Sequence, residues 1–235
     1  YDQLGLLDKE DCRVLKYLNL YKPLHLGIDF GNMCSLSVAQ EDRVQGRECL
    51  RVLKFLHTLA PEYLVELGEK FRNYFAPMQN KTVHLFYDRA GNSYKMVQKD
   101  QATEFKRAIE RDKDGKRTGW TVILESIGQG NIGQPEEYDF MLKLLSGSNP
   151  RLPIILIDYY AAKHLRQSLE GARTKIKSGV VFKDKRSEQL PIDQLPSQST
   201  NPSDSFKYLL MTKQRRKIAK GKVPIAGTFA DPSIV

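Results

Sequence analysis

Short apolar runs alternate with amphipathic stretches along most of the chain. Residues 24–30 are apolar enough for a buried strand, and 33–39 resumes a strand-like alternation beyond a Gly31-Asn32 turn, so the two predict a hairpin. The run 49–59 predicts a third strand, although its spacing also permits a helix. The chain therefore opens with strands that pair in sequence.

Helical and strand-like patterns take turns after residue 60. A proline opens the segment 61–75, and its apolar residues recur at helical spacing, which predicts a helix. The residues that share this face are Leu64, Leu67, Phe71 and Tyr74. Further strands are expected at 82–88, 120–126 and 153–158, and further helices at 98–112, 135–146 and 159–171. This alternation predicts crossover connections and a partly parallel sheet covered by helices, made mixed by the opening hairpin.

The character of the chain changes at residue 173. The segment 173–186 is rich in lysine and arginine and predicts a small β-hairpin, and 202–213 predicts a helix that Ser203 could cap. From Lys213 the chain is basic, contains glycine and proline, and is expected to be loose. We expect one α/β domain with ragged ends.

Composition excludes some classes of protein. Of the 235 residues, 40% are hydrophobic and 28% charged, as in ordinary globular proteins, and no apolar run approaches the roughly 20 residues that span a bilayer. The net charge of +9 favours polyanionic partners, above all nucleic acid.

The cysteines and the N-terminus indicate the setting of the protein. Cys12, Cys34 and Cys49 are odd in number and lack CxxC spacing, which favours a reducing compartment over disulfides or a thiolate zinc site. The first residues include neither an initiator Met nor a signal-peptide pattern. We expect a cytosolic fragment of a longer protein.

Three aspartates occupy positions at which chemistry is often found. Asp29 ends the first strand, Asp88 ends a later strand, and Asp204 lies in the first turn of the late helix. The carboxyl ends of parallel strands share one sheet edge, and a helix packed there can add a third carboxylate. Carboxylate oxygens suit Mg²⁺ or Mn²⁺, and such a set can hold two ions for phosphodiester cleavage.

Structural roles compete with this interpretation. Asp29 and Asp88 could serve the turns that follow them, and Asp204 could offset the helix dipole. Asp158 could be a fourth acidic ligand, but an N-cap for the helix expected at Tyr159 is favoured. Trp120 is expected in the core. We interpret the four histidines as structural or surface residues; they are His25, His57, His84 and His164.

Three segments together resemble one protein family. They are "LGIDFGNMCSLSV", "HLFYDRAGN" and "KDKRSEQLPIDQLPSQSTNPSDSFKYLL", and they are similar to the C-terminal nuclease domain of tailed-phage terminase large subunits over residues 24–212. The resemblance implies an RNase H-like fold, that is, a mixed sheet flanked by helices. It also implies an endonuclease that cuts double-stranded DNA during genome packaging, with Asp29, Asp88 and Asp204 holding two Mg²⁺ or Mn²⁺ ions.

The resemblance also implies an organisation and a set of partners. No GxxxxGK[ST] motif is present, so the ATPase half of a terminase is not part of this chain. We expect 1–23 to be the remnant of a linker from that half, 24–212 the nuclease domain and 213–235 a basic flexible tail. The expected partners are DNA, the ATPase half, the small subunit and the portal, with no membrane, in the cytoplasm of a bacterial host.

The basic segment is the candidate DNA contact. A solvated charged face is the alternative, but the local excess of cations favours phosphate contacts and a place beside the aspartates. The candidate residues are Arg173, Lys175, Lys177, Lys183, Lys185 and Arg186. The stretch 213–222 is a second candidate arm.

Two rival functions remain open. "GIDFGN" also resembles the first phosphate loop of the actin, Hsp70 and sugar-kinase ATPases, although the chain is short for that two-lobed fold. Alternatively, the domain is a non-catalytic, basic DNA-binding module whose carboxylates are structural.

Overall fold

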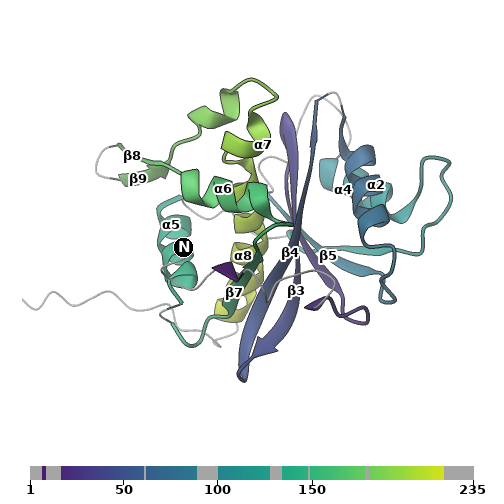
Figure 1. The fold of residues 1–235 in the computed structure, drawn as a ribbon, viewed down its shortest axis with the longest axis horizontal. Helices are drawn as coiled ribbons and strands as arrows, with labels where there is room; N and C mark the ends of the chain where they lie inside the picture. The colour runs from purple at the N-terminus through teal and green to yellow at the C-terminus, as the bar shows by residue number, and fades with distance from the viewer. Residues whose placement is uncertain are drawn as a thin grey trace, which may run out of the picture.

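Seven strands of the described residues form one mixed sheet at the centre of the molecule (Figure 1). The structure is a computed structural model that describes residues 7–8, 17–60, 62–88, 100–127, 134–147, 149–177 and 180–219. The strands of this sheet are β1 (Leu7–Asp8), β2 (Leu24–Asp29), β3 (Met33–Val44), β4 (Arg47–Leu59), β5 (Thr82–Tyr87), β6 (Thr121–Leu124) and β7 (Ile154–Asp158).

The strand order is β1-β7-β4-β3-β2-β5-β6. Strand β3 is antiparallel to both of its neighbours, and every other pair is parallel. As a result β2, β4, β5, β6 and β7 all end at the same edge of the sheet. This edge is where the candidate chemistry was expected.

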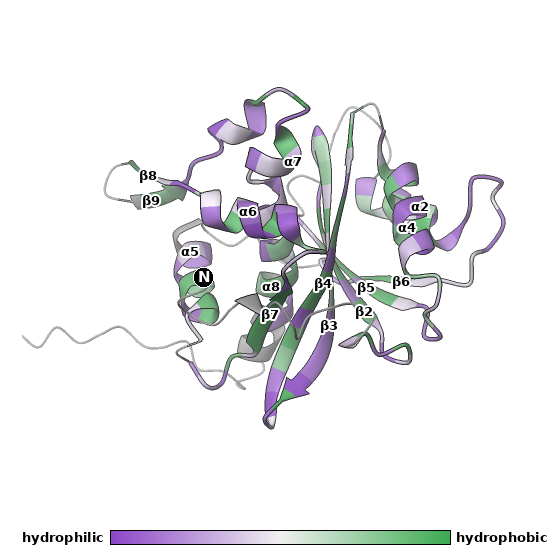
Figure 2. Ribbon diagram, viewed as in Figure 1, coloured by the Kyte–Doolittle hydropathy of each residue, from purple (hydrophilic) through white to green (hydrophobic). Residues whose placement is uncertain are grey.

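Helices cover both faces of the sheet (Figure 1). Helices α2 (Leu64–Tyr74) and α4 (Gln101–Glu110) lie on one face, and α5 (Gln134–Leu145), α6 (Lys163–Gly171) and α8 (Asn201–Ala219) lie on the other. A separate hairpin, β8 (Thr174–Lys177) with β9 (Val180–Lys183), leads through the 3-10 turn η2 (Arg186–Gln189) and α7 (Leu195–Gln198) into α8. Figure 2 shows apolar residues concentrated where helices meet the sheet.

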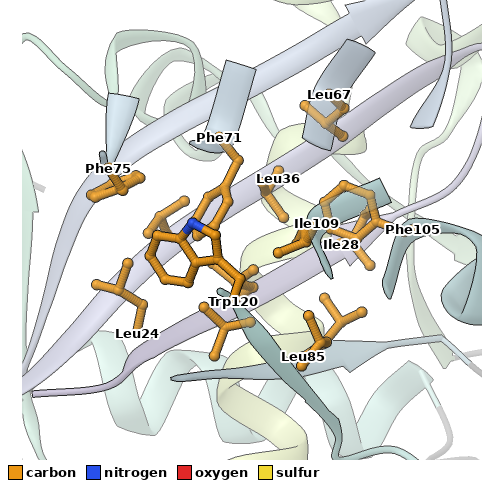
Figure 3. Packing of buried hydrophobic residues seen from close by; sticks show 14 of the residues in the cluster. Leu24, Ile28, Leu36, Leu67, Phe71, Phe75, Leu85, Phe105, Ile109 and Trp120 are labelled. Carbon is orange, nitrogen blue, oxygen red and sulfur yellow. The ribbon is translucent and has the colours of Figure 1, made fainter. Parts of the chain in front are cut away.

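Each face has its own core. Under α2 and α4, Phe71 and Phe105 are fully buried, and Trp120 packs 5.0 Å from Phe71, ring centre to ring centre (Figure 3). On the other face, Phe206 and Leu209 of α8 are fully buried against the sheet. The core position expected for Trp120 is confirmed.

Several boundaries differ from the expected ones. Helix α2 begins at Leu64, after its N-cap Tyr63. Its last buried residue is Phe71, whereas Tyr74 is exposed. Ser203 is not an N-cap, because α8 begins at Asn201. The expected loose region after Lys213 is helical as far as Ala219, and the rest of the segment 213–235 lies outside the described residues.

The N-terminal segment and the cysteines are partly described. Leu7 and Asp8 pair with β7, and Leu18 and Leu20 pack against the core, so parts of the segment 1–23 contact the domain. Cys34 and Cys49 are buried free thiols, and Cys12 lies outside the described residues. Among the described helices, each is too short or too polar to cross a membrane.

Candidate metal centre

Strands β2 and β5 carry the first two aspartates to the same place. They are parallel neighbours, and Ile28 is the register partner of Tyr87. The next residues are Asp29, the last residue of β2, and Asp88, which follows β5, so they lie side by side at the shared edge. Both side chains are partly buried.

Helix α8 brings the third aspartate, and a glycine makes its close approach possible. A Cβ atom on Gly27 would lie 2.1 Å from the backbone oxygen of Ser205. Gly27 thus faces α8, and so does Asp29, because side chains two residues apart share a face of the strand. The Ser37 and Ser205 hydroxyls, 2.8 Å apart, join β3 to the same turn of the helix. These contacts place Asp204 next to the end of β2.

Asp204 is fully buried, and three lysines surround it. Its Oδ1 atom lies 2.7 Å from Lys183 Nζ and 3.2 Å from Lys207 Nζ, and its Oδ2 atom lies 3.0 Å from Lys185 Nζ. Burial acts to raise the pKa of Asp204, but the three ammonium groups outweigh it and hold the pKa well below its usual range. Asp204 is therefore an anion at neutral pH.

Asp29 has the opposite balance. Burial and the charge of Asp204 raise the pKa of Asp29 to about 7, against the opposing effects of Lys185 and a hydrogen bond from Asn201. Asn201 Nδ2 donates to Asp29 Oδ2 over 3.0 Å, and its own Oδ1 accepts from Ser199. Two carboxylates that disfavour each other's charge are a frequent feature of cation sites.

Tyr208 lies in the field of all three aspartates. Burial raises the pKa of its hydroxyl far above the usual range, and Asp29, Asp204 and Asp88 raise it further. Within the described part of the chain, however, no three acidic, histidine or cysteine side chains are close enough together to hold a metal ion.

The donor chemistry nevertheless fits a hard divalent cation at Asp29 and Asp204. Both offer carboxylate oxygens, which Mg²⁺ and Mn²⁺ prefer. Asp204 Oδ2 is buried and negatively charged, and its described ionic partner is the Lys185 ammonium, 3.0 Å away. A cation fits this atom, and in the present arrangement the Lys185 ammonium occupies that position.

The basic segment divides into two groups. Lys183 and Lys185 point to Asp204, whereas Arg173 and Lys175 are exposed on the hairpin side. Arg186 is exposed and pairs with Asp184, with Arg186 Nη2 2.6 Å from Asp184 Oδ2. The expected hairpin is present; Lys177 is in β8, but its side chain lies outside the described set.

The remaining candidates have structural roles. Asp158 Oδ1 accepts from the backbone N–H groups of Tyr160 and Ala161, over 2.9 and 2.6 Å, and so stabilises the turn after β7. The expected N-cap role is wrong, because α6 begins at Lys163 and its N-cap is Ala162. His25 is buried and stacks on His84, with ring centres 5.1 Å apart.

Sequence reasoning missed three residues of the site. Asn201 holds Asp29, and Lys207 binds both Asp204 and Glu137. Asn201 lies three residues before Asp204, and Lys207 three residues after it. Residues three apart are neighbours on a helix surface, so this spacing could have identified both. Glu137 gave no such signal, because α5 reaches the site only through the tertiary fold.

Comparison with known proteins gives one kind of match. No protein-family profile matches the chain, and no curated protein matches it in sequence. The structure is similar to the large terminase of a thermophilic bacteriophage. For the complex of that terminase with ADP the TM-score is 0.50 at 15% identity, over 89% of this chain and 44% of the terminase chain.

A second crystal structure of the same phage terminase agrees. Its TM-score is 0.52 at 13% identity, over 90% of this chain and 43% of the terminase chain. The chain thus spans less than half the length of these terminases. The expected mixed α/β fold of RNase H-like type is confirmed, and this fold is shared with part of a phage large terminase.

Proposed function

We propose that this domain is the nuclease part of a phage large terminase, a metal-dependent endonuclease that cuts double-stranded DNA during genome packaging. The observation that carries the proposal is that Asn201 of α8 binds Asp29, three residues before the fully buried Asp204, at the sheet edge where Asp88 also lies. The fold shared with the large terminase of the thermophilic phage supports the same function.

Asp29 and Asp204 would hold the divalent cation, with Asp88 as the third carboxylate. When bound, Mg²⁺ or Mn²⁺ supplies a water nucleophile at neutral pH and offsets the charge that develops on the phosphodiester. The proposed site would hold two such ions.

The chain's own residues position these groups. Asn201 fixes one oxygen of Asp29, and Lys183 and Lys207 fix Oδ1 of Asp204, which leaves its Oδ2 atom facing the cation position. The exposed Arg173 and Lys175 would hold the DNA backbone beside the site, because phosphate contacts position a duplex without reading its sequence. Cutting would therefore show little sequence preference.

Nicking of supercoiled plasmid with Mn²⁺ and without ATP tests the proposal. Asp29→Asn should abolish cutting, because it removes one negative charge at nearly constant volume. Asp114→Asn, in an exposed loop, is the matched control and should cut like the wild type. Circular dichroism establishes that both variants are folded.

The rival functions predict other results. A phosphate-loop ATPase would hydrolyse ATP and leave the plasmid intact, and a non-catalytic module would bind DNA without cutting it. Undiminished cutting in EDTA would overturn the metal-dependent proposal.

A further inference from the structure

The three lysines around Asp204 are held in different ways. Lys183 also donates to the backbone oxygen of Thr200 over 3.0 Å and lies 2.8 Å from the Ser203 hydroxyl, so it ties β9 to the start of α8. Lys207 also pairs with Glu137, over 2.8 Å. Their side chains are only 20% and 15% exposed. Both are built into the packing of α8.

Lys185 is held more loosely. Its side chain is 44% exposed, and its other described ionic partner is Glu188, with Nζ 3.4 Å from Oε1. Glu188 itself is held in place, since it accepts a hydrogen bond from the Thr200 hydroxyl. Lys185 can therefore leave Asp204 and keep an anionic partner close by.

The position of the Lys185 ammonium is the one that a divalent cation needs. It contacts Oδ2 of Asp204, an oxygen with no other hydrogen-bond partner among the described residues, and its charge also acts on Asp29. A buried carboxylate needs a compensating cation, whether ammonium or metal. A divalent ion at Oδ2 would repel the Lys185 ammonium more strongly than the lysines around Asp204 repel one another, because it carries twice the charge and the site is poorly solvated.

We infer that Lys185 is an exchangeable cation: it neutralises the Asp29–Asp204 pair when no metal is bound, and a divalent ion displaces it. The displaced ammonium then faces a cleft of about 330 Å³ that Lys185 lines together with Tyr138 and Arg173, where it is available to a DNA phosphate. Lys185 is thus a positioning residue that serves the acidic pair and the DNA in turn. This inference rests on the proposed function.

Mn²⁺ binding without DNA, followed by calorimetry or electron paramagnetic resonance, tests the exchange. Lys185→Met keeps the length of the side chain and removes its charge, so Mn²⁺ should bind more tightly, on the order of tenfold, as is usual for two coupled ligands. Lys113→Met, in the exposed loop after α4, is the matched control and should bind Mn²⁺ like the wild type. Unchanged or weaker binding in Lys185→Met overturns the inference.

The wild-type protein offers a second test that needs no variant. Labelling with an amine-reactive reagent, read by mass spectrometry, should show Lys185 becoming more reactive at saturating Mg²⁺, while Lys183 stays protected. Unchanged reactivity of Lys185 overturns the exchange even if the variant fails to fold.

The two proposals fail in distinguishable ways. If Mn²⁺ binding requires Asp29 but does not respond to Lys185→Met, the metal site stands and only the exchange is wrong. If Asp29→Asn binds Mn²⁺ like the wild type, or the wild type binds none, the metal site is wrong and the exchange falls with it.

Discussion

At the scale of single residues, the candidate centre is a matter of charge balance. Asp204 has no solvent exposure, yet three ammonium groups lie within 3.2 Å of its carboxylate. The sequence predicted the aspartates from their places at strand and helix ends. It could not predict which lysines neutralise them, because Lys183 and Lys185 looked like members of a surface charge run.

The buried Lys183–Asp204 pair should contribute to stability. Lys183→Met removes a cation from a fully buried carboxylate, and breaking such a pair costs about 3 kcal/mol. Urea unfolding measures the loss. The exposed Lys175→Met should change the free energy of unfolding by less than about 0.5 kcal/mol. An equal, small effect of both substitutions would show that Lys183 is only surface charge.

His25 should make the stability depend on pH. Burial, with a smaller effect from Lys213, lowers its pKa from 6.5 to about 3, although Glu41 acts in the opposite direction and His84 lies against it. The unfolded state therefore binds the proton more readily. The contribution of His25 is fully present above pH 6.5 and is lost as the pH falls towards 3.

The expected loss from His25 is about 2 kcal/mol between pH 7 and pH 5. Urea unfolding at the two values measures it, and His25→Gln should lose correspondingly less on acidification. Equal pH dependence in the wild type and the variant would mean that His25 binds a proton as readily in the folded state as in the unfolded state.

At the scale of elements, the position of Asp204 depends on the close packing of α8 against β2. Gly27→Ala would place a methyl group 2.1 Å from Ser205 O and 2.7 Å from Leu209 Cβ, so the helix that carries Asp204 would have to move. We expect a loss of about 3 kcal/mol in the free energy of unfolding, together with weaker Mn²⁺ binding. Gly171→Ala, which meets no atom within 4 Å, is the control and should be neutral. A tolerated Gly27→Ala would show that α8 does not pack this closely.

Element types were more predictable than element ends. Short apolar runs, with alternation at 33–39, predicted β2 to β7, although a helix was left open for the run that forms β4, and the alternation of strands and helices predicted α2, α4, α5 and α6. The ends depend on tertiary contacts: α8 continues past Lys213 because Gln214 is buried and Lys213 pairs with Glu41 at 2.7 Å. A basic composition with downstream glycine and proline could not reveal those contacts.

At the scale of the whole molecule, part of the positive charge behind the net charge of +9 lies at the β8–β9 hairpin. The hairpin of β8 and β9 lies on the side of the sheet covered by α8 (Figure 1), and Arg173 and Lys175, before and within β8, are exposed. Replacing both by alanine should weaken binding to unrelated duplexes to a similar degree. It should also flatten the salt dependence by about 0.9 in log–log slope for each DNA phosphate that the protein no longer neutralises.

Titration of DNA at several salt concentrations measures that slope. Lys113→Ala, in an exposed loop after α4, is the control and should leave it unchanged. If the double substitution behaves like Lys113→Ala, the hairpin face is solvated charge and does not contact DNA.

The overall architecture was predictable because the strands alternate with helices and the motifs lie at strand ends. The degree of burial could not be predicted: nothing in the sequence indicates that Asp204 is fully buried while Asp29 is only partly buried. That difference comes from α8 lying across β2, a long-range contact that local patterns do not encode.

The most direct measurement is a crystal structure of the domain soaked with Mn²⁺, with anomalous scattering to locate the ions. We predict an anomalous peak at about 2.1 Å from oxygens of Asp29 and Asp204, the distance usual for a small divalent ion, with Lys185 moved away from Oδ2. A soaked crystal in which Lys185 still contacts Asp204 and no Mn²⁺ lies at Asp29 would contradict it.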